Sequence, residues 1–80
     1  MELKVFISDN CPSCPAAKEL AMRYPFSKLY RLEESEGLAE AAYHNVLCTP
    51  SFLLVDENDH ILKAWRCHIP KPREIEHFAA

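Results

Sequence analysis

A short apolar run near the middle of the chain places the strongest constraint on the fold. Residues 51–55 read SFLLV, with Pro50 before them and the polar turn DEND at 56–59 after them. A run of this length, without polar alternation, is typical of a central strand that is covered on both faces. A chain of 80 residues has room for only one core, so we expect residues 1–80 to form a single domain with layers on both sides of a sheet.

The flanking sequence supplies further strands and helices in alternation. Residues 2–8 predict a strand, and residues 60–67 return after the turn to form a hairpin with the apolar run. The remaining predicted elements are a helix from about Cys11 or Pro12 that Pro25 ends, an edge strand over 28–33, a helix over 35–44 and a last helix with Pro72 in its first turn. The resulting order, βαβαββα, predicts an α/β fold with a four-stranded mixed sheet, helices on both faces and the first two strands parallel.

The apolar spacing within each predicted helix marks the face that should turn toward the sheet. The side chains expected to face inward are Ala17, Leu20, Ala21 and Tyr24 in the first helix, Leu38, Ala41 and Ala42 in the second, and Ile75, Phe78 and Ala79 in the third. Ser35 is expected to cap the second helix. The acidic residues expected to form a solvated surface are Glu33, Glu34, Glu36 and Glu40.

Composition narrows the class of protein further. A formal charge of −3 at pH 7 disfavours non-specific binding to nucleic acid. No segment resembles a signal peptide and no apolar run approaches the length of a membrane span, so we expect a cytoplasmic protein without a membrane partner. We also expect a monomer. Thiols are usually kept reduced in the cytoplasm, where a close cysteine pair is more often catalytic or metal-binding than a permanent brace.

Two cysteines, Cys11 and Cys14, lie between the first predicted strand and the helix that follows it. At the start of a helix the Cys11 sulfur would lie beside N–H groups without partners and the positive end of the helix dipole, which both favour a thiolate. Cys14 shares that helix face one turn later and should be less accessible. Pro12 and Pro15 fit a first helical turn and stiffen it. The pattern favours a redox pair in which one sulfur attacks and the other resolves.

Two other uses of the cysteines stay open at this stage. A structural bridge between Cys11 and Cys14 would close a short loop, for which chain entropy gives only about 2 kcal/mol of stabilisation. A zinc or iron–sulfur site would take Cys48 and Cys67 as further ligands. Zinc ribbons usually bring two close ligand pairs, whereas these two cysteines stand far apart in the sequence.

The segment LCTPSF, residues 47–52, places a threonine and a proline directly before the predicted central strand. Together with the early CPSC motif in this order of elements, it resembles the thioredoxin superfamily, in the small form of glutaredoxin-like and thioredoxin-like redoxins. The resemblance spans essentially the whole chain and implies a thioredoxin-like fold. It also implies a dithiol–disulfide oxidoreductase in which Cys11 is the nucleophile and Cys14 the resolving thiol of a redox-active disulfide. Pro50 is then a cis-proline against these cysteines, and Thr49 docks an extended substrate by β-addition.

Departures from the family pattern narrow the expected substrate. Asn10 stands where many thioredoxins have a tryptophan, and residues 67–70 read CHIP where glutaredoxins have a glycine pair near the glutathione carboxylate. The resemblance therefore implies a disulfide-containing protein, rather than glutathione, as substrate, with Pro12 of the CPSC motif as a further substrate-binding residue. No bound cofactor is expected, and an external reductase or thiol would restore the dithiol. The alternatives are a non-enzymatic metal or iron–sulfur binding domain and a redox-idle interaction module of the same fold.

Other reactive side chains receive more ordinary interpretations. Cys48, close to Pro50, is expected either to pack as a small hydrophobe or to act as a third redox thiol. Cys67 is expected to pack in the core on one strand face with Trp65. Lys18 is expected to be an exposed lysine of the first helix. The four histidines are scattered along the chain, and no catalytic role is predicted for them.

Overall fold

The strands and helices follow one another in the predicted order βαβαββα. The computed structural model describes residues 1–79 and contains β1 (Glu2–Ile7), α1 (Cys14–Ala21), β2 (Ser27–Arg31), α2 (Ser35–Tyr43), β3 (Ser51–Val55), β4 (Ile61–Trp65) and α3 (Pro72–Ala79). The sheet order is β2-β1-β3-β4. β1 pairs in parallel with β2 and antiparallel with β3, and β3 and β4 form the antiparallel hairpin. The predicted four-stranded mixed sheet, with β2 at an edge, is confirmed.

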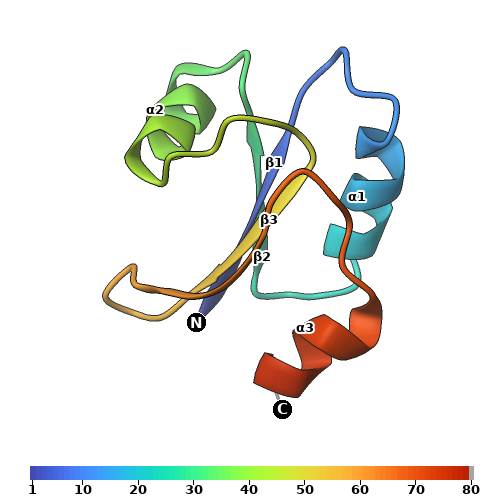
Figure 1. Ribbon diagram of the computed structural model, residues 1–80, viewed down its shortest axis with the longest axis vertical. Coiled ribbons are helices and arrows are strands. Elements are labelled where there is room, and N and C mark those ends of the chain that lie inside the picture. Colours follow the sequence, from blue (N-terminus) through green and yellow to red (C-terminus); the bar gives the residue numbers. More distant parts are fainter. Residues whose placement is uncertain (80) are drawn as a thin grey trace.

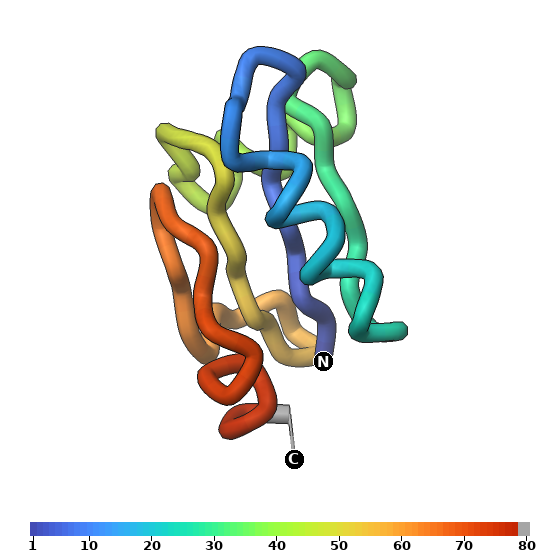
Figure 2. Tube along the Cα trace, turned by 90° about the vertical axis from the view of Figure 1, so that its right-hand side faces the viewer, coloured from blue at the N-terminus to red at the C-terminus, as the bar shows by residue number. Residues whose placement is uncertain are grey.

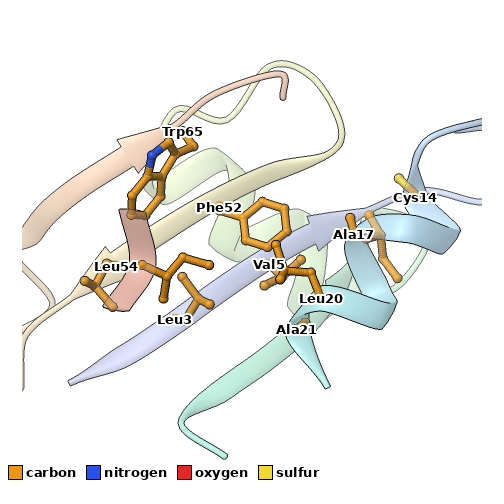
Figure 3. Close-up of a cluster of buried hydrophobic side chains, with 11 residues drawn as sticks. Leu3, Val5, Cys14, Ala17, Leu20, Ala21, Phe52, Leu54 and Trp65 are labelled. Carbon is orange, nitrogen blue, oxygen red and sulfur yellow. The ribbon is translucent and has the colours of Figure 1, made fainter. Parts of the chain in front are cut away.

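Helices cover both faces of this sheet (Figure 1). Figure 2, a tube along the chain seen from the side, shows α1 and α3 in front of the strands. The core on their face consists of Leu3, Val5, Ile7, Cys14, Ala17, Leu20, Ala21, Phe52, Leu54, Trp65 and Ile75, most of which Figure 3 labels. The core on the α2 face consists of Phe6, Tyr30, Ala41, Val46, Leu53 and Val55. Neighbouring residues of β3 enter opposite cores and the whole strand is buried, which confirms SFLLV as the central strand.

The α2 helix packs on the sheet with a different face from the predicted one. Leu38 is 59% exposed and Ala42 is also exposed, whereas Gly37 and Ala41 are buried. A Cβ atom on Gly37 would overlap the backbone carbonyl of Arg31, so this helix approaches β2 more closely than any other residue at that position would allow. The close approach turns the glycine side of the helix inward and leaves Leu38 outside.

Helix boundaries also differ from the sequence-based expectation. α1 begins at Cys14 rather than at Cys11 or Pro12, and it ends at Ala21, before the predicted stop at Pro25. The preceding residues form a turn that the Cys14 N–H closes by donating to the Cys11 carbonyl oxygen at 3.2 Å. In α2 the expected cap, Ser35, is instead the first helical residue.

The last helix matches its prediction in part. Ile75 of α3 is fully buried, while Phe78 is 40% exposed and meets the Trp65 ring edge-on at 6.2 Å between centroids. The side chain of Ala79 lies outside the described residues. Within residues 1–79, none of the helices has the length and apolar character that crossing a bilayer requires.

A partly buried charged cluster joins β1, α2 and the β3–β4 turn. The Lys4 ammonium donates to Glu40 at 2.5 Å, to Asp59 at 2.7 Å and to His44 Nε2 at 3.1 Å. Burial alone would lower the pKa of Lys4, but the hydrogen bonds with Asp59 and Glu40 outweigh it and raise that pKa above its ordinary value. Burial, and then the Lys4 charge, lowers the pKa of His44, whose Nε2 serves as an acceptor. Glu40 therefore belongs to this cluster and not to the predicted solvated surface.

Candidate active site

The first cysteine pair lies where β1 passes into α1. Cys11 and Cys14 form a disulfide with their Cα atoms 5.3 Å apart. Cys14 is 5% exposed and belongs to the core on the α1 face, while Cys11 is only partly buried. The two sulfurs therefore differ in accessibility in the predicted direction, although Cys11 lies in the turn before α1 and not on the helix itself.

Hydrogen bonds hold the loop that carries Cys11 against the end of β2. Glu33 accepts the Ser8 hydroxyl at 2.9 Å and the Asp9 backbone N–H at 3.0 Å. The N–H bond, and then the hydroxyl bond, lowers the pKa of Glu33 below its ordinary value. Arg31 donates from Nη2 to both carboxylate oxygens of Asp9 at 2.8 Å. Glu33 thus positions the loop, a role that the prediction of a purely solvated surface did not include.

A shallow groove of about 290 Å³ runs beside the first disulfide. Its lining residues are Ile7, Ser8, Asp9, Cys11, Cys14, Pro15, Lys18 and Arg31. Lys18 is exposed, as predicted, and places a positive charge in the wall of the groove. Access to the pair is therefore open from solvent along a groove that carries charged side chains in its wall.

The Thr49–Pro50 peptide bond is cis, as the resemblance implies. Pro50 is buried and Thr49 is partly buried. Ser51 pairs with Phe6, so this segment lies beside the end of β1 from which the Cys11 loop departs. In Figure 1 the loop before β3 and the loop after β1 lie toward the same end of the sheet. Pro12, the remaining predicted site residue, is exposed in the CPSC turn.

A second disulfide joins Cys48 and Cys67, whose Cα atoms are also 5.3 Å apart. Cys48 is partly buried and Cys67 is exposed, with a left-handed backbone at φ 67°. The prediction of core packing for Cys67 is wrong because β4 ends at Trp65 and the chain turns away from the sheet beyond it. A signal was present in the sequence, since the two cysteines flank the two ends of a predicted hairpin and such ends lie side by side.

The disulfides pair the four cysteines two by two, whereas the metal alternative requires them around one ion. Another set of candidate ligands, Glu40, His44 and Asp59, lies close enough together to hold a cation. The Lys4 ammonium already donates to all three of these side chains. The i, i+4 spacing of Glu40 and His44 would have indicated that this histidine has a carboxylate neighbour.

Comparison with known proteins identifies the fold. No family profile and no curated protein matches the sequence. Thioredoxin 1 of Thermosipho africanus TCF52B has a similar structure, with a TM-score of 0.73 at 16% identity over 99% of this chain and 94% of that one. An uncharacterised thioredoxin-like protein of Clostridium perfringens gives a TM-score of 0.74 at 19% identity, over 96% of this chain and 66% of that one. A thioredoxin of Thermus thermophilus gives 0.66 at 18% identity, over 96% of this chain and 69% of that one.

These likenesses extend over nearly all of this chain. The order of strands and the placement of helices on both sheet faces agree with them. The chain therefore has the fold of the thioredoxin superfamily.

Proposed function

We propose that the chain is a dithiol–disulfide oxidoreductase that reduces disulfide bonds of other proteins. The observation that carries the proposal is the unequal exposure of one disulfide: Cys11 is accessible while Cys14 is 5% exposed. An accessible sulfur can meet a target, and a shielded neighbour can react only after the target has been captured. The thioredoxin fold and the cis peptide bond at Pro50 add support.

The reaction proceeds by two thiol–disulfide exchanges. The Cys11 thiolate attacks one sulfur of the target disulfide; a bond forms between Cys11 and that sulfur, and the second target sulfur leaves as a thiolate that takes up a proton. Cys14, as a thiolate, then attacks the Cys11 sulfur, and the first target sulfur leaves in the same way. Two electrons have passed to the target, and the Cys11–Cys14 disulfide remains. An external reductase or thiol returns two electrons to the pair.

The surroundings of the pair suit a polypeptide target. Thr49 is partly buried, two residues before the strand that begins at Ser51, and offers its backbone to an extended segment. The exposed Pro12 lies in the CPSC turn beside the attacking sulfur. Asp9 and Arg31 give the adjoining groove charges of both signs. A peptide that lies across this surface would place its disulfide over Cys11.

Trapping of the mixed disulfide tests the proposal. Cys14→Ser keeps the attacking sulfur and removes the resolving one, so this variant should accumulate covalent adducts with an oxidised protein such as insulin, and dithiothreitol should release them. Cys11→Ser is the matched control and should trap almost nothing. Equal trapping by the two variants would contradict the assigned roles of the two sulfurs. No trapping by either variant would reject the proposed activity.

A further inference from the structure

The second disulfide fastens the residues that precede β3 to the end of β4. Residues 47–50, which we call the docking loop, contain Cys48 and lead directly into the buried Ser51. The Ser51 hydroxyl donates to the Cys48 carbonyl oxygen at 2.8 Å and accepts the Cys67 backbone N–H at 3.1 Å. Both backbones are therefore already held in place by hydrogen bonds, and the disulfide can open without releasing all the contacts between them.

Three residues that are not glycine have a left-handed backbone among those the structure describes: Asn45, Asp59 and Cys67. Asparagine and aspartate tolerate this conformation, because their short polar side chains bond locally, but cysteine has no such compensation. A side chain at position 67 that is exposed and unsuited to its backbone contributes little to packing. The feature of Cys67 that matters at this position is therefore its sulfur, which forms the disulfide with Cys48.

The surroundings of the second disulfide leave it open to reagents. A hollow of about 290 Å³ adjoins it, lined by Asn45, Leu47, Cys48, Arg66 and Cys67. Leu47, one of these lining residues, is 86% exposed. The Arg66 guanidinium donates to the Asn45 carbonyl oxygen at 3.1 Å, which fixes a positive charge in the same wall. A positive charge favours a thiolate over a thiol nearby.

We propose that Cys48 and Cys67 form a second thiol–disulfide site, which an external thiol or dithiol opens and closes while the protein stays folded. The incoming thiolate attacks the exposed Cys67 sulfur; a bond forms between these two sulfurs, and Cys48 leaves as a thiolate that takes up a proton. A second external thiolate then attacks the sulfur of the first, which frees Cys67 as a thiolate that is also protonated. Two electrons and two protons have passed to the protein, and the external thiols leave as a disulfide.

Opening this site should weaken the binding of protein substrates. Cys48 is the neighbour of Thr49, so the second disulfide restrains the docking loop at the residue before the proposed docking position. If the loop is ordered in only a fraction of the molecules, the apparent affinity for substrate is the intrinsic affinity multiplied by that fraction. This consequence rests on the proposed function, whereas the existence of the second site does not.

A redox titration of Cys11→Ser/Cys14→Ser tests the site in isolation, because only Cys48 and Cys67 remain. The folded variant is equilibrated in mixtures of reduced and oxidised dithiothreitol, alkylated and examined by mass spectrometry, with circular dichroism as the check on folding. The expected result is that both thiols appear together, as one two-electron couple, while the fold persists. Independent alkylation of the two cysteines under oxidising conditions would overturn the proposal, as would a disulfide that opens only when denaturant is added.

Kinetics of insulin reduction test the consequence. At a reductant ratio that the titration shows to leave Cys48–Cys67 closed, Cys48→Ser/Cys67→Ser should raise KM by about fivefold over that of the unaltered protein, at the lower end of common coupling strengths, and leave kcat and the alkylation rate of Cys11 unchanged. An unchanged KM would remove the link to docking. If the unaltered protein reduces no protein disulfide at all, the proposed function fails, while the titration still decides whether the second site exists.

Discussion

The two disulfides of this small domain differ in what they connect. Cys11 and Cys14 are 3 positions apart and share one turn, whereas Cys48 and Cys67 are 19 positions apart and lie at the two ends of the β3–β4 hairpin. By the loop-entropy relation, the first closure is worth about 2 kcal/mol and the second about 3 kcal/mol. The first pair can thus change state at a lower cost to the free energy of folding than the second.

The pairs also differ in the depth of their sulfurs. Cys14 belongs to the core on the α1 face, so the first pair presents one accessible sulfur and one shielded sulfur. In the second pair Cys67 is exposed and Cys48 is partly buried. An attacking pair requires a shielded resolving thiol, whereas a pair that is itself attacked requires only an accessible sulfur. The same chemistry therefore suits catalysis at one pair and control at the other.

The largest expected effect separates the pairs by turnover. Cys11→Ser should lower insulin reduction to the rate of the reductant alone, because Cys14, the other sulfur of the CPSC turn, is only 5% exposed and poorly placed to attack a target. Cys67→Ser should retain kcat, because its sulfur takes no part in the exchange steps. The measurement is the steady-state rate as a function of insulin concentration. A Cys67→Ser variant as inactive as Cys11→Ser would erase the division between a catalytic and a controlling pair.

Stability under oxidising conditions should rank the pairs in the opposite order. Removal of the second pair by Cys48→Ser/Cys67→Ser should lower the free energy of unfolding by about 3 kcal/mol, and Cys11→Ser/Cys14→Ser by about 2 kcal/mol. Urea denaturation measures both values. In excess dithiothreitol the two differences should largely disappear, which serves as the control. A larger loss for the first pair would mean that native-state contacts, rather than loop length, set these energies.

Most of the fold could be predicted because it depends on local patterns. The unbroken apolar run at 51–55 required a central strand, and the alternation of elements around it required helices on both faces. The inward face of α2 could not be predicted in this way. It depends on the close approach of Gly37 to the Arg31 backbone in β2, and a residue defined by the absence of a side chain gives no apolar signal.

The candidate site was predictable to the extent that it is local. The CPSC turn and the Thr49–Pro50 segment are short motifs, and the structure places both at one end of the sheet. The second disulfide depends on where β4 ends, and a difference of two residues moved Cys67 from an expected core position to an exposed turn. Element boundaries are the least certain part of a sequence-based prediction, so a pairing that depends on one is easily missed.

A smaller effect should follow from Ser51, which bonds to the backbones of both Cys48 and Cys67. Ser51→Ala removes these bonds and lets the two cysteines separate more easily once they are reduced. A loss of about 1 kcal/mol corresponds to roughly a fivefold change in the thiol–disulfide equilibrium, toward the dithiol. Alkylation at set dithiothreitol ratios should show this shift for the second pair and none for Cys11–Cys14. A common shift of both pairs would point to general loosening of the fold.

The smallest expected effect concerns the backbone at Cys67. A residue with a side chain is strained by roughly 1 to 2 kcal/mol in the left-handed conformation. Glycine relieves this strain in the folded state, but it also gives the unfolded chain more conformational freedom, which offsets part of the stabilisation. In excess dithiothreitol, Cys67→Gly should therefore be more stable to urea than Cys67→Ser by about 0.5 to 1 kcal/mol. Asn45→Gly is the matched control and should gain less, since asparagine tolerates its φ of 58°. Equal stability of the two variants at position 67 would remove the evidence that this chain accepts backbone strain in order to keep a sulfur there.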